Sequence, residues 1–231
     1  MKLSIIIPTF NEERTILFVI DALAALHLPF QHEVVVVDDG STDATWSTLQ
    51  HLKKKKFPFS VRLLRHMKNK GKGAALKTAF RATTGEIILI QDADLEYEPK
   101  EIPSILQPIL DKKAVVVFGS RIIKMNRIRY PLYYFGNIFL SIITSLLYVS
   151  VVTDMETGYK AFRKEALQGI DLHARRFDVE PELTAKLLKK GYKIHQVPIT
   201  YICRSKQDGK KISWKDGFSA LWCLVKYRFV D

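Results

Sequence analysis

The sequence predicts an α/β fold whose core is a mostly parallel sheet flanked by helices. Apolar, β-branched runs recur along its first part, at Leu3–Ile7, Glu33–Val37, Ser60–Leu64 and Glu86–Ile90. Each run is separated from the next by enough residues for one helix, which is the spacing of β-α-β units. The runs are nearly continuous in apolar residues, as expected of strands that are covered on both faces.

The segments between the runs have helical character. Apolar residues recur at helical spacing within Glu12–Leu26, and Gly73–Thr83 is rich in good helix formers. With 231 residues, of which 47% are hydrophobic, the chain can bury a sizeable core. No linker and no fixed-period repeat divides it, so we expect one domain over residues 1–231.

The net charge and the number of cysteines indicate the kind of binding partner and the cellular compartment. Lys and Arg number 36 against 24 Asp and Glu, which gives a formal charge of +12. This balance indicates an anionic partner, either nucleic acid, a phosphorylated ligand or a membrane surface. Two cysteines are too few for a disulfide framework and favour a reducing compartment. The first apolar run is too short for the core of a signal peptide, so we expect a cytoplasmic protein.

Polar clusters follow three of the first four expected strands, at Pro8–Glu12, Asp38–Asp43 and Gln91–Glu96. Taken singly, each cluster could be a helix cap or a turn. Parallel strands, however, bring their carboxyl ends to one edge of a sheet, where ligands bind. The three clusters together therefore predict one functional site.

The third cluster has the composition of a metal site. Asp92 and Asp94 stand two residues apart at a strand end, and Glu96 extends the series. Such carboxylates suit Mg2+ or Mn2+ that is held jointly with a substrate phosphate. A solvated acidic turn is the alternative for the two aspartates alone, but their position after an apolar strand favours a metal. The scattered His and Cys residues form no zinc pattern.

A segment rich in glycine and lysine, Lys68–Gly73, precedes the third expected helix. It could offer backbone N–H groups, a helix N-terminus and lysines to a phosphate, or its lysines could simply be solvated. Its spacing differs from that of a P-loop, and the dinucleotide-binding glycine pattern is absent as well. A Walker-type ATPase and a nicotinamide dehydrogenase are therefore disfavoured.

Seven motifs stand in a fixed order along the chain. The first four are Ile7–Glu12, Val36–Asp43, Gly71–Gly73 and Asp92–Asp94, and the later three are Gly119–Arg121, Asp154–Lys160 and Arg204–Asp216. The first four resemble the motifs of the family-two glycosyltransferases with the GT-A fold. The later three are similar to the branch that glycosylates polyprenyl phosphates, typified by dolichyl-phosphate mannose synthase.

The resemblance implies a role for each matched position. It places Arg121 and Arg204 near the acceptor phosphate, and together with Asp94 they would carry the catalysis. Residues 1–125 would form the nucleotide-sugar and metal half, and residues 126–231 the acceptor half. The positions assigned to the nucleotide sugar are Pro8, Thr9, Glu12, Asp39, Gly71, Lys72 and Asp92, and those assigned to Mg2+ or Mn2+ are Asp92, Asp94 and Glu96.

Two departures from the family pattern matter. Many members of the branch have Gln where this chain has Glu96, and the extra negative charge would tighten the metal. Many relatives also continue into transmembrane helices, whereas this sequence stops at Asp231. Membrane attachment would then come from within the chain or from a separate membrane-anchoring partner.

Two apolar segments are candidates for that attachment. Residues 130–152 carry no charge and are long enough to span a bilayer, but a single crossing would separate the acidic site from Arg204. We therefore expect an interfacial helix there, with a buried core helix as the alternative. Residues 215–229 form a second apolar stripe with basic neighbours. Lys210 and Lys211 precede it, where a lipid phosphate would meet the sugar donor.

We interpret the chain as an inverting, metal-dependent hexosyltransferase of EC class 2.4. It would move mannose or glucose from GDP-mannose or UDP-glucose to dolichyl or undecaprenyl phosphate, while attached peripherally to the cytoplasmic face of a membrane. A soluble saccharide or protein acceptor is the alternative, and it would need a base such as Asp154 or Glu156. A nucleic-acid-binding protein is disfavoured, because the basic residues are not interleaved with a stacking platform.

Overall fold

The structure is a computed structural model that describes residues 1–52, 54–124, 126–204 and 214–230. Two short 3-10 helices, η1 (Pro99–Glu101) and η2 (Lys164–Leu167), accompany the longer elements. In chain order the longer elements are β1 (Lys2–Thr9), α1 (Ile16–Ala24), β2 (Gln31–Asp38), α2 (Thr45–Leu52), β3 (Ser60–Arg65), α3 (Lys72–Ala82), β4 (Ile87–Ile90), α4 (Ile102–Leu110), β5 (Val116–Ser120), α5 (Pro131–Tyr148), β6 (Lys160–Arg163), α6 (Val179–Lys189), β7 (Ile194–Pro198) and α7 (Trp214–Phe229).

The described strands form one sheet in the order β3-β2-β1-β4-β6-β5-β7. β1 pairs in parallel with β2 and β4, and β2 pairs in parallel with β3. β6 is antiparallel to β4 and β5, and β7 is parallel to β5. The predicted α/β class with a mostly parallel sheet is confirmed. The carboxyl ends of the first four strands reach the same edge of the sheet.

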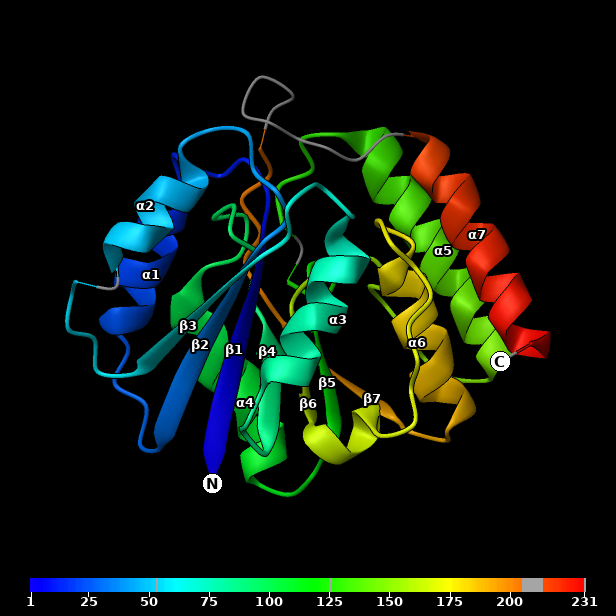
Figure 1. Cartoon of the computed structure of the whole chain (residues 1–231). Helices are drawn as coiled ribbons and strands as arrows, with labels where there is room; N and C mark the ends of the chain where they lie inside the picture. Colours follow the sequence, from blue (N-terminus) through cyan, green and yellow to red (C-terminus); the bar gives the residue numbers. More distant parts are fainter. Residues whose placement is uncertain (53, 125, 205–213, 231) are drawn as a thin grey trace.

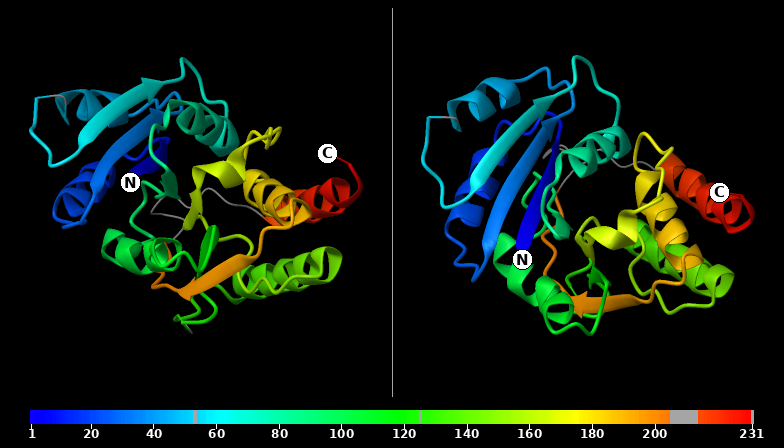
Figure 2. Two further views of the ribbon diagram at one scale, coloured as in Figure 1. Left: turned by 90° about the horizontal axis from the view of Figure 1, so that it is seen from below. Right: turned by 60° about the horizontal axis from the view of Figure 1, so that its bottom comes forward.

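Helices cover both faces of the sheet (Figures 1 and 2). α1, α2 and α4 pack on one face, where Ile5 and Ile7 of β1 are buried. α3 and α6 cover the other face, where Ile6 is buried, and α5 and α7 lie beside α6. Alternate residues of β1 therefore enter two cores, which explains why this strand is a continuous apolar run.

The loop between β1 and α1 holds an acidic residue at the sheet edge. α1 begins at Ile16, later than the sequence suggested. The backbone N–H of Glu12 donates to Thr45 Oγ1 at 2.8 Å, and its carbonyl accepts the N–H groups of Thr15 and Ile16. Glu12 is 7% exposed, so this loop fixes a nearly buried carboxylate beside the end of β1.

α5 and α7 pack against each other at one side of the molecule (Figure 1). Tyr148 Oη donates to Leu224 O at 2.8 Å, and Arg228 Nε donates to Leu147 O at 2.8 Å. By length and composition alone α5 could cross a membrane, and 22% of the helix is buried. A set of exposed apolar side chains on this pair, which we call the apolar stripe, consists of Leu132, Phe135, Phe139, Ile142 and Leu146 on α5 and Phe218, Trp222 and Phe229 on α7.

Candidate active site

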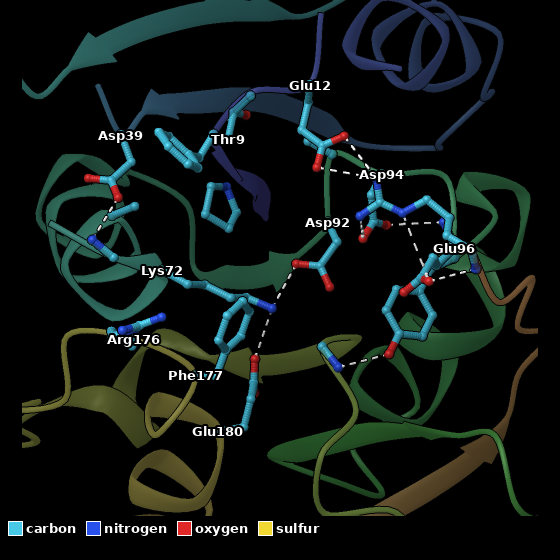
Figure 3. Close-up of a pocket in the computed structure, with 18 of the residues that line it drawn as sticks. Thr9, Glu12, Asp39, Lys72, Asp92, Asp94, Glu96, Arg176, Phe177 and Glu180 are labelled. Carbon is cyan, nitrogen blue, oxygen red and sulfur yellow. Dashed lines mark hydrogen bonds and ion pairs between the residues drawn. The ribbon is translucent and has the colours of Figure 1, made fainter. Parts of the chain in front are cut away.

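The carboxyl ends of β1, β2 and β4 open into a cavity of about 350 Å³, which we call the polar cleft (Figure 3). Its lining brings together every described residue that the sequence predicted for the nucleotide sugar, the metal or the acceptor phosphate. Lys210 and Lys211 lie outside the described residues. The predicted residues in the lining are Pro8, Thr9, Glu12, Asp39, Gly71, Lys72, Asp92, Asp94, Glu96, Arg121 and Arg204.

Arg204 sits among carboxylates at one end of the polar cleft. Its Nη1 lies 3.1 Å from Glu12 Oε2, and its Nη2 lies 2.8 Å from Asp94 Oδ2. Glu96 accepts the backbone N–H of Arg204 at 2.9 Å and the hydroxyl of Tyr201 at 2.9 Å. The guanidinium that was expected beside an acceptor phosphate is thus paired here with the acids that follow β1 and β4.

Asp94 lies close to two other carboxylates, those of Asp92 and Glu96. Burial, and then the charges of Asp92 and Glu96, raise the pKa of Asp94 to about 7 against the opposing effect of Arg204. A divalent cation between Asp92 and Asp94 would relieve this repulsion, so the oxygen donors fit Mg2+ or Mn2+. Within the described ranges no group of three His, Cys, Asp or Glu side chains forms a metal site. Water and phosphate oxygens would therefore supply the remaining ligands.

Lys72, the first residue of α3, bridges the cleft to α6 (Figure 3). Its Nζ lies 2.8 Å from Asp92 Oδ1 and 3.0 Å from Glu180 Oε1. Burial alone would lower the pKa of Lys72, but the two carboxylates raise it well above its ordinary value. Glu180 also pairs with the fully buried Lys160. Lys72 therefore stays charged and restricts the orientation of Asp92.

Gly158 confines Asp92 from another direction. A Cβ atom at position 158 would lie 2.2 Å from Asp92 Oδ2, so glycine leaves free the space that this carboxylate occupies. The backbone N–H of Gly158 donates to Tyr97 Oη at 3.1 Å, which holds the segment in place. The Gly158 that the sequence singled out within a motif thus acts by its small size.

Asp39 organises the loop that precedes α3. Its carboxylate accepts the backbone N–H groups of Lys70 at 3.0 Å and of Gly71 at 2.7 Å. The N–H of Gly73 donates to Arg175 O at 2.9 Å. The amides of Lys70, Gly71 and Gly73 therefore already have acceptors within the protein, and phosphate binding by this segment stays a prediction.

Arg121 follows β5 and is held by Asp154. The carboxylate of Asp154 accepts Arg121 Nε at 2.7 Å, Nη2 at 2.6 Å and the backbone N–H at 2.8 Å, and it also accepts Asn137 Nδ2 at 2.8 Å. Burial would raise the pKa of Asp154, but Arg121 and these hydrogen bonds hold it below its usual value. Asp154 is therefore poorly suited to act as the base that a hydroxyl acceptor would need.

A second cavity, of about 610 Å³, adjoins the polar cleft and lies between the start of α5 and the start of α7. We call it the apolar groove, because aromatic and aliphatic side chains such as Tyr133, Phe139 and Leu221 line it. Arg127 and Arg129 also belong to its lining. The residues that line both cavities are Arg121, Glu156, Phe177 and Tyr201.

Some residues of the polar cleft had not been predicted from the sequence. Arg176, Phe177 and Glu180 come from the start of α6 and the loop before it (Figure 3). They follow no strand and belong to no motif used above. His66 supports the cleft from behind, because its Nδ1 lies 2.6 Å from Asp39 Oδ1. Acidic residues in the first turn of a helix are common, so only the fold reveals the role of Glu180.

Comparison with known proteins identifies the family. Residues 4–170 match the model of glycosyl transferase family 2. The chain belongs to this family. A UDP-N-acetylglucosamine–dolichyl-phosphate N-acetylglucosaminyltransferase from Methanococcus voltae is 32% identical over 96% of this chain and 94% of its own length. The dolichol-phosphate mannosyltransferase of Pyrococcus furiosus is 31% identical over 91% of this chain, which spans 59% of that relative.

Solved structures share the fold. Glucosyl-3-phosphoglycerate synthase from Mycobacterium tuberculosis, in complex with uridine diphosphate, superposes with a TM-score of 0.76 at 21% identity, covering 100% of this chain and 81% of that one. The same enzyme with Mn2+ and UDP-glucose gives a TM-score of 0.75 at 22% identity, covering 98% and 78%. The membership in family two and the fold that the motifs implied are thus confirmed.

Proposed function

We propose that this family-two glycosyltransferase transfers a hexose from a nucleoside-diphosphate sugar to a polyprenyl phosphate at a membrane surface. The observation that carries the proposal is that the polar cleft and the apolar groove share a wall. One cavity offers carboxylates and lysine for a metal-bound diphosphate, and the other offers an apolar channel for a lipid. A sugar held where they meet could pass directly from the first ligand to the second.

On the donor side, the chain's own residues bind and orient the nucleotide sugar. Asp92 and Asp94 would hold a divalent ion, which when bound would act as a Lewis acid on the leaving diphosphate. Lys72 and Glu180 keep Asp92 in one orientation, with Lys72 Nζ 2.8 Å from the Asp92 carboxylate. Such preorganisation lowers the barrier because little rearrangement is needed during the reaction.

On the acceptor side, the lipid would lie in the apolar groove, with its phosphate head group facing the wall that the two cavities share. Arg127 and Arg129 line the groove and would provide positive charge for the phosphate. A phosphate oxygen is already ionised near neutral pH, so it can attack the sugar without a general base. The low pKa and full pairing of Asp154 are compatible with this reaction.

Attachment to the membrane would use the apolar stripe. α5 is anchored to α7 through Tyr148 and Arg228, and its side chains at Phe135, Phe139 and Leu146 are 62%, 53% and 71% exposed. A helix with one face packed on its own domain and the other face apolar fits a position in the bilayer interface. The net charge of +12 would add attraction to anionic lipids. We propose that the protein attaches in this way to the cytoplasmic face of a membrane.

The names of the relatives set the donors to test. The names of three relatives contain three different sugars. They are a mannosyltransferase, an N-acetylglucosaminyltransferase and the dolichyl-phosphate β-glucosyltransferase of Dictyostelium discoideum, which is 29% identical to this chain. GDP-mannose and UDP-glucose remain our proposed donors, and UDP-N-acetylglucosamine belongs in the same panel. A soluble acceptor remains the alternative, which the apolar groove disfavours.

The test is transfer of radiolabelled sugar into a lipid phase. Purified protein is incubated with each labelled donor, Mg2+ or Mn2+, and polyprenyl phosphate in detergent, and the mixture is then extracted with organic solvent. We expect label in the organic phase with the hexose donors and none without polyprenyl phosphate. Label that stays in the aqueous phase, attached to an added saccharide or peptide, would contradict the proposal.

A further inference from the structure

Four side chains line both cavities, and three of them have their polar groups occupied or have none. The guanidinium of Arg121 is paired with Asp154, the hydroxyl of Tyr201 donates to Glu96, and Phe177 has no polar side-chain atom. Glu156 differs from these three. Neither of its carboxylate oxygens makes a hydrogen bond or ion pair with the described part of the chain, and Oε1 is buried without a partner.

The unpaired carboxylate of Glu156 can accept several hydrogen bonds from a ligand or from water. Leaving a buried acceptor unpaired is costly, so such a group at a cavity wall is usually completed by a ligand or by water. Burial and the neighbouring charge of Glu180 raise the pKa of Glu156 to about 7, as expected where donors are lacking. The backbone N–H of Glu156 donates to Asn137 Oδ1 at 3.3 Å, which holds the main chain at this position.

We infer that Glu156 forms a subsite for the transferred sugar, in which its carboxyl group accepts a hydrogen bond from a hydroxyl of the hexose ring. The inference rests on the proposed function, which puts the diphosphate beside Asp92 and Asp94 and the lipid phosphate in the apolar groove. The hexose must then lie between them, at the wall that Glu156 shares. Glu156 is thus a residue that selects the sugar and not a base, since the phosphate nucleophile needs none.

The test separates binding of the sugar from binding of the nucleotide. Calorimetry with Mn2+ compares the affinities for GDP-mannose against GDP and for UDP-glucose against UDP, in the wild type and in Glu156→Leu and Glu156→Gln. We expect Glu156→Leu to lose roughly tenfold to hundredfold of affinity for the preferred sugar nucleotide and to keep the affinity for the free diphosphate. Glu156→Gln retains an accepting oxygen, so it should keep most of the sugar's contribution.

A matched control is Glu98→Gln. Glu98 pairs with Lys100 and lines neither cavity, so this change should leave both affinities as they are. The inference is overturned if Glu156→Leu binds the sugar nucleotide and the diphosphate as the wild type does, or if the wild type itself binds both equally.

Failure of this inference is distinguishable from failure of the proposed function. If the wild type transfers hexose to polyprenyl phosphate and Glu156→Leu keeps the wild-type sugar affinity, only the inference fails. If sugar affinity depends on Glu156 but no lipid product forms, the subsite stands and the lipid acceptor is wrong. Loss of diphosphate affinity in Glu156→Leu would place Glu156 at the diphosphate instead and would overturn the sugar subsite.

Discussion

Asp94 has both a raised pKa and a direct cation partner. Its pKa is raised to about 7 by burial and by Asp92 and Glu96, while Arg204 lies 2.8 Å away and opposes the shift. Asp94→Asn removes the repulsion as well as the ion pair, so we expect the protein to fold with little change in melting temperature.

The same substitution should abolish function. An amide is a far poorer ligand than a carboxylate for Mg2+ or Mn2+, so we expect turnover to fall by roughly a hundredfold or more. Calorimetry with Mn2+ and nucleotide should show that the metal no longer strengthens nucleotide binding. If nucleotide binding by Asp94→Asn depends on the metal as it does in the wild type, Asp94 is not a metal ligand.

Gly158 permits a second prediction at the scale of single residues. In Gly158→Ala the new methyl carbon would lie 2.2 Å from Asp92 Oδ2 unless that carboxylate moves. The atom it meets is the end of a side chain, so the fold should tolerate the change while Asp92 is displaced. We expect a nearly normal melting temperature and at least about a tenfold loss of donor affinity in the presence of Mn2+.

A suitable control is Gly136→Ala, because no atom lies within 4 Å of a Cβ built at Gly136. This change should leave donor binding in the polar cleft intact. Equal donor affinity in Gly158→Ala and the wild type would mean that the position of Asp92 is unimportant for the donor.

At the scale of secondary-structure elements, Glu33 ties β2 to β1 and to the turn before β4. It accepts Ser4 Oγ at 2.6 Å and Thr84 N at 2.6 Å, and its Oε2 lies 3.2 Å from Lys2 Nζ. Burial alone would raise the pKa of Glu33, but these hydrogen bonds lower it to about 2 from an ordinary value of 4.5. The ionised carboxylate therefore contributes roughly 3 kcal/mol to stability.

The sign of the pH dependence follows from the lowered pKa. The contribution of Glu33 is fully present above about pH 4.5 and is lost as the pH falls toward 2. Denaturant unfolding should therefore show Glu33→Gln to be less stable than the wild type at pH 7, with the difference shrinking in acid. Glu165→Gln, at an exposed position, should show no such difference. If the difference in free energy of unfolding between Glu33→Gln and the wild type is constant from pH 7 to 3, the pKa of Glu33 is not lowered in the folded protein.

The elements also show what could be predicted from the sequence and why. Asp92 and Asp94 were predictable because a buried strand immediately precedes them, and the parallel sheet fixes where its end must lie. Glu180 was not predictable, because only the fold brings the start of α6 within reach of Lys72, which is far away in the sequence. The partners of the Lys70 and Gly71 amides could not be predicted, because their acceptor is the carboxylate of Asp39, which is distant in the sequence.

The apolar stripe lies at one side of the whole molecule. It belongs to the α5–α7 pair, while α1 and α2 lie at the opposite side (Figure 1). We expect the protein to bind vesicles of anionic lipid and to be released by alkaline carbonate or high salt. Phe139→Glu and Leu146→Glu should each weaken binding by about tenfold or more, because they place a charge on the side that enters the interface.

Phe18→Glu is the matched control for this surface. Phe18 is 65% exposed but belongs to α1, so the same change of charge should leave vesicle binding nearly intact. Equal loss in all three variants would show that binding depends on net charge alone. Resistance to carbonate, together with protease access from both sides of the vesicle, would mean that the chain spans the bilayer.

In the proposed reaction a hexose crosses from the polar cleft to a lipid phosphate in the apolar groove. Mass spectrometry of purified polyprenyl phosphate, after incubation with the wild-type protein, Mn2+ and each sugar nucleotide, tests this transfer. We expect a lipid product heavier than the acceptor by one hexose residue, formed by the wild type and absent with Asp94→Asn. An unmodified lipid, with the sugar recovered as free hexose or on a water-soluble acceptor, would contradict it.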